Sequence, residues 1–374
     1  MTKLRVLYFG SGGGKGVTHM MVNLAVGHAR SGRVEPYLVF RRKRGQPLAE
    51  QFRRQLAEAG VAFCEVVPSP KSRLLAELER AMREFRPEVF VGQGYPEHIW
   101  GRFAAQRVGV PVLLQVEQNH EHYKWLHLRR TKRLAAQTGA IVAVSHAVAD
   151  NLRRLGLPAE KLRVIYNTVR LDRFCTAAHP WAEREPVVMS TARFGRQKDH
   201  ATLLRAIALL RDRGRPVHLR MAGGGKRLQR WHARWLIWRL GLGGLVELLG
   251  MRSDVPELVG RSRVFVLSTH FEGLPLGLIE AMASGCAAIG TRAPGVEELI
   301  DHGRTGFLAT HKDPAALADC IEAALGEAGE RCAAAAAREG PAIYGLEKIT
   351  AEYETLFAEL MRGHGPSAGG SEAL

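Results

Sequence analysis

Two glutamates stand eight positions apart in the stretch Ser268–Ile300, which reads STHFEGLPLGLIEAMASGCAAIGTRAPGVEELI. An apolar run ending at Leu267 precedes it, a loop with glycine and proline carries Glu272, and a helix-forming segment carries Glu280. Glycine permits close backbone approach, and the first N–H groups of a helix have no partner within the helix, so this order predicts a phosphate cradle. The alternative is an ordinary strand, loop and helix with two solvated glutamates, since acidic groups near a helix start favour the dipole.

A second charged loop lies 70 to 75 residues before the start of this stretch. The apolar run Val187–Thr191 predicts a strand, and the loop ARFGRQKD that follows contains Arg193 and Lys198. Two cations at the carboxyl end of a strand can clamp a diphosphate. A basic loop without a ligand is the alternative, and it would have to coincide with the Glu-x7-Glu stretch in the same domain.

The segment FEGLPLGLIEAMASG, followed by PGVEELIDHGRTGFL, resembles the donor site of glycosyltransferase family 4, the glycosyl transferases group 1. The resemblance runs from the first glycine loop to about residue 360 and is strongest over 187–308. It implies an α/β protein of the GT-B fold, with two Rossmann-like doubly wound domains facing across a cleft. It also implies an enzyme, a retaining glycosyltransferase, whose nucleotide-diphosphate-sugar donor we expect to be UDP-linked rather than GDP- or ADP-linked.

The resemblance assigns roles to individual residues. Arg193 and Lys198 would hold the donor pyrophosphate, Glu272 would contact the sugar, and Glu280 would hold the ribose hydroxyls. We expect Glu272, Arg193 and Lys198 to be catalytic, with no residue acting as nucleophile and the leaving phosphate accepting the proton of the acceptor. The other predicted donor-binding residues are Gly14, Gly16, Met251, Arg252, Gly273, Leu276, Gly277 and Leu278.

Two positions in the first half depart from the family pattern. The glycine loop after the first strand reads GSGGGKGVTH and matches neither a dinucleotide fingerprint nor a Walker loop. Thr18 stands where the family often has an acidic residue. At the end of the strand 110–116, Glu117 and Gln118 occupy positions where the family often has a histidine, and His120 is the nearest imidazole. His120 is therefore a catalytic candidate, and a surface histidine is the open alternative.

The positive charge is concentrated in the first half of the chain. Residues 1–170 hold 28 Lys and Arg against 13 Asp and Glu, whereas residues 171–374 hold 25 against 24. An acidic partner would therefore meet the first half, such as an anionic membrane surface or a phosphorylated lipid. The alternative is a basic surface that only keeps the protein soluble.

The segment Lys124–Arg133, KWLHLRRTKR, places Trp125 and two leucines beside five cations. On a helix this pattern is typical of interfacial membrane binding, although the apolar residues could equally pack the first domain. The candidate membrane or acceptor residues are Arg41, Arg42, Lys43, Arg44, Lys124, Trp125, Arg129, Arg130, Lys132 and Arg133. A second aromatic set, Trp231, Trp235 and Trp238, falls on one helical face, and we interpret it as core packing.

Length and composition are consistent with two α/β domains, since 374 residues with 46% hydrophobic content can bury two cores. We expect an N-terminal acceptor-side domain over 1–170 and a donor domain over 171–345. A helix over 346–362 would return to the first domain, and 363–374 would be a disordered tail. The five cysteines lack metal or disulfide spacing, and neither a signal peptide nor a membrane span is expected. These features favour a cytoplasmic protein, peripheral on the inner face of the membrane if it binds lipid.

The chain contains no Asp-x-Asp motif, so we expect no metal cofactor and stabilisation of the leaving diphosphate by cations. The predicted function is metal-independent transfer of a sugar from a nucleotide donor to a glycan or glycolipid acceptor. The charge distribution favours a membrane-linked precursor of a cell-surface polysaccharide or lipopolysaccharide. The alternatives are a transferase for soluble acceptors and a sugar-nucleotide epimerase on the same fold. A nucleic-acid-binding protein is disfavoured, since aromatic residues are not interleaved with base-reading groups.

Overall fold

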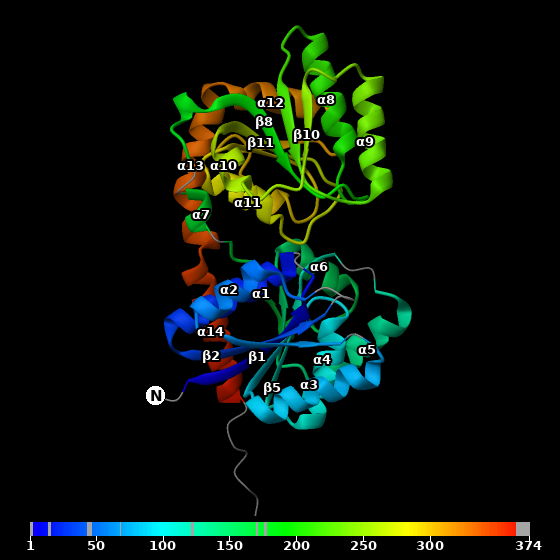
Figure 1. Ribbon diagram of the computed structural model, residues 1–374, viewed down its shortest axis with the longest axis vertical. Coiled ribbons are helices and arrows are strands. Elements are labelled where there is room, and N and C mark those ends of the chain that lie inside the picture. The colour runs from blue at the N-terminus through cyan, green and yellow to red at the C-terminus, as the bar shows by residue number, and fades with distance from the viewer. Residues whose placement is uncertain are drawn as a thin grey trace, which may run out of the picture. The chain divides into compact units, whose positions relative to one another are not determined.

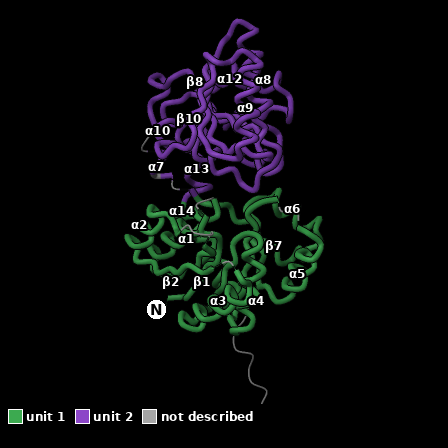
Figure 2. The backbone as a smooth tube through the Cα atoms, turned by 45° about the vertical axis from the view of Figure 1, so that its right-hand side comes forward, with its two compact units in different colours: residues 1–168, 346–374 green, residues 169–345 purple. Residues whose placement is uncertain are grey.

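The chain forms two compact units, residues 1–168 with 346–374 and residues 169–345 (Figure 2). The computed structural model describes residues 3–13, 16–42, 47–67, 69–120, 123–169, 171–175 and 178–363. Each unit has a parallel sheet between helices (Figure 1), so the predicted pair of Rossmann-like domains of the GT-B fold is confirmed. The predicted tail lies outside the described residues except for Gly363.

Unit 1 is built on a seven-stranded parallel sheet with the order β3-β2-β1-β4-β5-β6-β7 in its described part. The strands are β1 (Leu4–Ser11), β2 (Val34–Arg41), β3 (Ala62–Val66), β4 (Val89–Gln93), β5 (Val112–Glu117), β6 (Ala140–Ala143) and β7 (Leu162–Val164). The helices are α1 (Gly16–Ser31), α2 (Glu50–Glu58), α3 (Lys71–Phe85), α4 (Glu97–Val108), α5 (Trp125–Ala135), α6 (His146–Arg154) and α14 (Leu346–Gly363). The order reverses between β1 and β4, and ligands of doubly wound sheets bind at the carboxyl edge there.

Unit 2 has a six-stranded parallel sheet with the order β10-β9-β8-β11-β12-β13 in its described part. The strands are β8 (Glu185–Thr191), β9 (His218–Ala222), β10 (Val246–Gly250), β11 (Ser262–Leu267), β12 (Ala287–Thr291) and β13 (Phe307–Ala309). The helices are α7 (Leu171–Cys175), α8 (His200–Asp212), α9 (Arg227–Arg239), α10 (Val255–Gly260), α11 (Leu276–Ala283), α12 (Pro314–Leu325) and α13 (Glu327–Tyr344). Short 3-10 turns occur at Trp181–Glu183 and Glu297–Leu299 of this unit, and at Ala159–Lys161 of unit 1. The order reverses between β8 and β11, the strands that precede the two predicted donor loops.

The last helix, α14, packs against α1 of unit 1. Glu354 accepts hydrogen bonds from His28 Nδ1 at 3.2 Å, Ser31 Oγ at 2.5 Å and Arg33 Nε at 2.6 Å. Burial opposes ionisation of Glu354, but these three donors outweigh it and hold its pKa at about 2. The chain thus returns to the first unit, and the charged carboxylate of Glu354 holds α14 against the end of α1.

The prediction that the tryptophans of α9 pack in the core is wrong. Trp231, Trp235 and Trp238 expose 60%, 41% and 75% of their surface, and the core is reached instead by Ala233 and Ile237 with Leu236. The helix has two apolar faces, and the smaller side chains fill the narrow space over α8. Among the described residues, no helix is long and apolar enough to span a bilayer.

Candidate functional site

Two loops of unit 2 are joined by backbone hydrogen bonds at the carboxyl edge of the sheet. Asp199 N–H donates to the carbonyl of Ser268 at 3.0 Å, and His270 N–H donates to that of Gln197 at 2.9 Å. The first loop follows β8 and the second follows β11, and these strands are neighbours at the point where the strand order reverses. Sequence segments about 70 residues apart are thereby held in register, as the two predicted donor loops require.

This register brings Lys198 against Glu272. Lys198 Nζ lies 2.5 Å from Glu272 Oε1, and the two side chains are only 13% and 10% exposed. The pair therefore combines two residues predicted from separate motifs. A largely desolvated ion pair is costly to break, since either partner left alone would be a buried charge.

Further polar groups fix the Glu272 carboxylate in place. Gln197 Nε2 donates to Oε2 at 3.1 Å, and the Thr269 hydroxyl lies 2.7 Å from Oε1. The Glu272 N–H donates to the carbonyl of Pro294 at 2.9 Å, and a Cβ on Gly295 would lie 2.2 Å from the Glu272 carbonyl oxygen. Gly295 also has φ of +79°, so only glycine fits this close approach without strain. The carboxylate is therefore held from three directions.

Arg193 is exposed, and its backbone is fixed by His200. His200 Nε2 donates to the Arg193 carbonyl at 3.3 Å, and the imidazole lies against the Phe194 ring at a centroid distance of 4.5 Å. Burial lowers the pKa of His200 to about 4, partly offset by that hydrogen bond. His200 is therefore neutral at pH 7, and it holds the carbonyl of Arg193 while the Arg193 residue is exposed.

The helix α11 begins immediately after the Glu272 loop. A Cβ on Gly277 would meet Thr191 Oγ1 at 3.1 Å, so the first turn of α11 packs closely on the end of β8. Gly273 and Leu278 are buried, whereas Leu276 and Gly277 are half-buried. The unpaired N–H groups of such a first turn favour an anion.

Glu280 lies on the same helix and differs from Glu272 in its surroundings. Burial raises the pKa of its carboxyl to about 7, and Arg173 opposes that rise. Its carboxyl group makes no hydrogen bond to a described residue. One of the two predicted carboxylates is therefore ion-paired, whereas the other changes its protonation near neutral pH.

The remaining predicted donor residues are more dispersed. Met251 is 81% exposed and lies over Gly224, while Arg252 Nε donates to Asp254 Oδ1 at 2.8 Å. Gly16 is the exposed first residue of α1 in unit 1, and Gly14 lies outside the described residues. Thr18 is buried, and its hydroxyl donates to the carbonyl of Ser11 at 2.7 Å. Where the family has an acidic group, this chain therefore has a hydroxyl that binds its own backbone.

Unit 1 has a buried polar network at the carboxyl end of β5. Arg102 Nη2 donates to His98 Nδ1 at 2.9 Å, so Nε2 of His98 carries the proton and donates to the Tyr123 hydroxyl at 3.1 Å. Tyr123 in turn donates to Glu117. Burial and the neighbouring Arg102 hold the pKa of His98 well below its usual value, so the imidazole is neutral.

The neighbouring predicted residues lie beside this network. The Gln118 amide donates to Gln93 at 2.7 Å and accepts from Asn167 at 2.9 Å. The backbone N–H of His120 donates to the side chain of Asn119 at 2.9 Å, and its imidazole is half-buried. Nothing in this arrangement singles out His120 over His98 as the chemically relevant imidazole.

The basic residues predicted for membrane or acceptor contact differ among themselves. Arg41 Nε donates to the buried Glu97 at 2.6 Å, and Arg42 pairs with Glu65, so both are engaged within unit 1. Lys43 and Arg44 lie outside the described residues. The exposed members are on or next to α5: Lys124, Trp125, Arg129, Lys132 and Arg133. Arg130 is half-buried, with its guanidinium 5.7 Å from the centre of the Trp100 ring.

Asp199, His270 and His311 form a cluster that could hold a metal ion. Their ligand atoms lie within 4.8 Å of one another, and the cluster could not be predicted from the sequence because the residues come from three separate segments. Two imidazoles and a carboxylate suit zinc or another transition metal. Asp199 already caps α8 through Thr202, and His270 Nδ1 lies 2.8 Å from His311 Nε2, so the side chains also satisfy one another.

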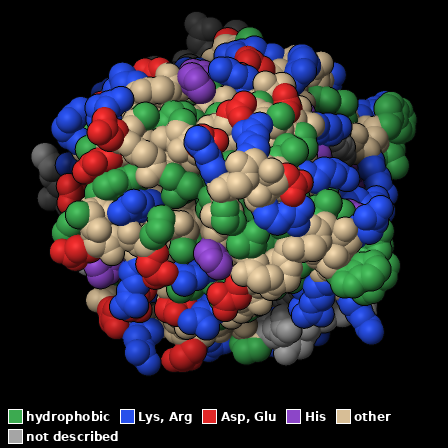
Figure 3. Space-filling model, turned by 90° about the horizontal axis from the view of Figure 1, so that it is seen from above, with side chains coloured by type: hydrophobic (Ala, Val, Ile, Leu, Met, Phe, Trp, Pro, Cys, Tyr) green, Lys and Arg blue, Asp and Glu red, His purple; other side chains and the backbone are tan. Residues whose placement is uncertain are grey.

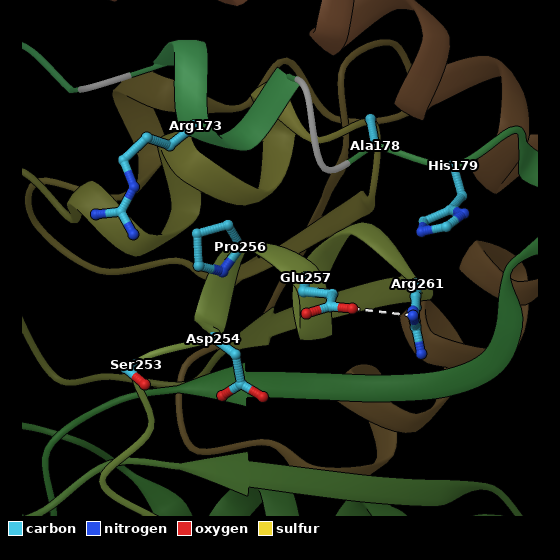
Figure 4. Close-up of a pocket in the computed structure, with 8 residues that line it drawn as sticks. All are labelled: Arg173, Ala178, His179, Ser253, Asp254, Pro256, Glu257 and Arg261. Atoms are coloured by element: carbon cyan, nitrogen blue, oxygen red, sulfur yellow. Dashed lines mark hydrogen bonds and ion pairs between the residues drawn. The ribbon is translucent and has the colours of Figure 1, made fainter.

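A pocket of about 580 Å³ lies elsewhere in unit 2 and is shown in Figure 4. It is lined by Arg173, Ala178, His179, Ser253, Asp254, Pro256, Glu257 and Arg261. Glu257 and Arg261 form an ion pair of 2.9 Å across one side of it. None of the predicted donor residues is among its described lining, so the chemistry inferred from the motifs is not located in this pocket.

Two sequence profiles of one family match the chain. The profile of Glycosyltransferase Family 4 matches residues 14–173, and that of Glycosyl transferases group 1 matches residues 185–327. The first covers most of unit 1 and the second most of unit 2. Residues 174–184 lie between the two matches.

Curated relatives match part of the chain, and solved structures match most of it. The chain is 28% identical to N-acetyl-alpha-D-glucosaminyl L-malate synthase of Bacillus anthracis, over 60% of this chain and 61% of that protein. It is 30% identical to the lipopolysaccharide core biosynthesis glycosyltransferase LpsE of Rhizobium meliloti, over 50% and 53%. It therefore spans less than two thirds of these relatives. Anabaena Alr3699/HepE, solved with UDP and glucose, has the same fold, with a TM-score of 0.81 at 19% identity over 95% of this chain and 100% of that one.

Proposed function

This chain belongs to glycosyltransferase family 4, and we propose that it transfers a sugar from a UDP-linked donor, with retention, to a membrane-linked glycan precursor. The product would contribute to a cell-surface polysaccharide or lipopolysaccharide. The observation that carries the proposal is the Lys198–Glu272 pair, because it joins the two predicted donor motifs at the carboxyl edge of one sheet.

The cations of unit 2 are suited to a leaving diphosphate. Lys198 is held at the loop, Arg193 is exposed on a fixed backbone, and the first turn of α11 adds unpaired N–H groups. Positive groups that are already in place stabilise charge as it develops on a breaking glycosidic bond. We infer that these groups take the role a metal ion has in other nucleotide-sugar enzymes, so that catalysis is metal-independent.

Retention would follow from transfer on one face of the sugar. In that step the bond from the anomeric carbon to the phosphate oxygen breaks, the bond to the acceptor oxygen forms on the same side, and the acceptor proton passes to the leaving phosphate. Glu272 is already bound to Lys198 and Gln197, which suits a residue that positions a sugar rather than one that attacks it.

The acceptor is proposed from charge and from relatives. Residues 1–170 hold an excess of 15 positive charges, which favours an anionic or membrane-linked acceptor at the inner face of the cytoplasmic membrane. The Rhizobium meliloti relative, which is named for lipopolysaccharide core biosynthesis, supports the same class. A soluble acceptor is the second candidate, because the Bacillus anthracis relative is named for L-malate.

The donor assignment is tested by thermal shift with UDP-, GDP- and ADP-sugars. We expect stabilisation by a UDP-sugar in the wild type and in Arg196→Ala, an exposed cation of the same loop, but not in Lys198→Ala. Stabilisation of all three proteins alike would contradict the site. Turnover with lipid extracts and with soluble sugars then identifies the acceptor, and interconversion of sugar nucleotides without any acceptor would instead identify an epimerase.

A further inference from the structure

The helix α9 of unit 2 has an exposed apolar face that the donor site does not use. Leu228, Trp231, Trp235 and Trp238 expose between 41% and 75% of their surface. The opposite face of the helix packs into the core of unit 2 against α8. A soluble surface rarely exposes so many large apolar side chains side by side, and such patches mark interaction sites.

The spacing of these side chains makes them one stripe. Positions 228, 231, 235 and 238 recur at three and four residues, so at 100° per residue they share one side of the helix. The buried residues Ala233, Leu236 and Ile237 fall on roughly the opposite side. The stripe runs for about 15 Å along the helix axis. Solvent therefore meets a continuous aromatic edge rather than scattered side chains.

Basic residues flank the stripe on both sides. Lys226, Arg227, Arg230, Arg234 and Arg239 are all exposed, and the sequence from 213 to 246 contains no Asp or Glu. Figure 3 shows hydrophobic side chains beside Lys and Arg at the right-hand edge of the view. Unit 2 holds 24 Lys and Arg against 19 Asp and Glu, so the five cations beside the stripe equal the whole positive excess of the unit.

We propose that α9 is an interfacial membrane helix that binds a bilayer surface containing anionic lipid. Tryptophan and leucine would enter the boundary between headgroups and acyl chains, and the flanking arginines would meet lipid phosphates. The helix is already folded and fixed through its inner face, so binding needs no new structure. This surface is additional to the basic residues of unit 1, and it does not depend on the identity of the acceptor.

Charge and shape favour lipid over the other occupants. A second copy of the same helix would bring two positive faces together, which is unfavourable. A nucleic acid would match the charge, but all four side chains of the stripe are leucine or tryptophan, so no polar side chain that reads base edges belongs to the stripe itself. A continuous apolar stripe between two basic borders matches the interface of an anionic bilayer best.

The test is flotation of the full chain, without any nucleotide sugar, with two kinds of vesicle. One is phosphatidylcholine alone, and in the other about one third of the lipid is phosphatidylglycerol. We expect the wild type to prefer the anionic vesicles by about tenfold. The double change Trp231→Gln with Trp238→Gln should reduce that partitioning by about tenfold, since both side chains are exposed and their loss should leave the fold intact.

A charge variant and two controls complete the test. Arg230→Gln with Arg234→Gln should also weaken binding, and the binding that remains should become less sensitive to salt, because fewer charges are left to screen. Arg331→Gln with Arg338→Gln removes the same charge from the exposed side of α13 and should change little. Unchanged binding in the α9 variants would overturn the proposal. So would loss of binding in Trp125→Gln with Leu126→Gln on α5 alone, or binding to single-stranded RNA in place of vesicles.

Discussion

Each sheet ends in a buried carboxylate, but the two units compensate that charge in different ways. In unit 2, Glu272 lies directly against the cation Lys198. In unit 1, Glu117 accepts from the hydroxyl of Tyr123, which in turn accepts from a neutral His98, and the cation Arg102 stands one residue further away. Similar strand edges therefore present a close ion pair in one unit and a relay of hydrogen bonds in the other.

The difference indicates what each edge can bind. A lysine beside an incoming diphosphate can exchange one anionic partner for another, so unit 2 suits a charged donor. A relay of neutral groups, with Arg102 held inside by Thr138 at 2.6 Å, offers fixed donors and acceptors instead. Such an edge suits hydroxyl groups of a sugar, and unit 1 is the predicted acceptor side.

Breaking the Lys198–Glu272 ion pair should have the largest effect on turnover and on stability. Lys198→Ala is expected to lower turnover by about 10² to 10³-fold, since a fixed cation at the leaving group is lost. It should also lower the free energy of unfolding by about 3–5 kcal/mol, because Glu272 becomes a buried unpaired charge. Steady-state kinetics and chemical unfolding measure the two effects.

The double variant Lys198→Met with Glu272→Gln separates these effects. With both charges removed, we expect most of the stability to return while turnover remains low. Recovery of turnover together with stability would show that the pair is structural only. Arg196→Ala, from the same loop, is the matched control and should retain turnover within about threefold.

In unit 1, Tyr123→Phe should interrupt the relay without touching the donor. Removing the hydroxyl takes a donor from Glu117 and an acceptor from His98, and both are buried. We expect a loss of about 1–3 kcal/mol in the free energy of unfolding, measured by urea titration. The affinity for the UDP-sugar should stay the same. If Tyr123→Phe lowered the affinity for the UDP-sugar as much as Lys198→Ala does, donor binding would not be a property of unit 2 alone.

The sequence allowed the donor loops to be predicted because their chemistry is local. Glu272 and Lys198 each belong to a short motif after an apolar strand, and parallel strands align their carboxyl ends. The relay of unit 1 could not be predicted in that way. Its members come from α4, β5 and the segment before α5. The helix α4 was not predicted, because Glu97, His98 and Arg102 are buried and the helix has no clear polar face.

The helix α9 shows a different limit of pattern reading. The three-four spacing of its tryptophans is typical of a buried stripe, but a second stripe of smaller apolar residues exists on the same helix. Periodicity alone does not say which stripe faces the core. The short strand β3 was missed for a related reason, since AFCEV is mixed in polarity and only its last residue is buried.

Glu280 extends the comparison within unit 2, because it is a carboxylate without a close cation. Its pKa of about 7 lies above that of an unfolded glutamate, so the folded state binds the extra proton and stability falls as pH rises from about 4.5 through 7. Glu280→Gln should therefore raise the melting temperature at pH 8 and leave it unchanged at pH 5. An equal gain at both pH values would argue against a desolvated carboxyl group.

The same carboxyl group should make donor binding depend on pH. If its ionised form holds the ribose hydroxyls, affinity for UDP-glucose should rise by up to about tenfold between pH 6 and pH 8 in the wild type. Glu280→Gln should bind more weakly, with no such rise. The affinity can be measured by calorimetry with UDP-glucose. Its diphosphate is esterified at both ends and therefore does not change its own protonation between pH 6 and pH 8. A pH-independent affinity in the wild type would remove Glu280 from the ribose site.

The smallest expected effect concerns metal removal, and it tests whether lysine is the cation of unit 2. Dialysis against EDTA should change turnover by less than about twofold, because fixed cations are proposed to stabilise the leaving diphosphate. Asp199 caps α8, and His270 and His311 bind each other, so a metal would have to displace existing hydrogen bonds. If EDTA abolished turnover and Mg²⁺ or Mn²⁺ restored it, Lys198 and the other fixed cations would not be sufficient to stabilise the leaving diphosphate. If His311→Gln then prevented the restoration, the metal ion would bind at the cluster of Asp199, His270 and His311. The difference between the sheet edges of the two units would then be a bound metal ion in unit 2 rather than Lys198.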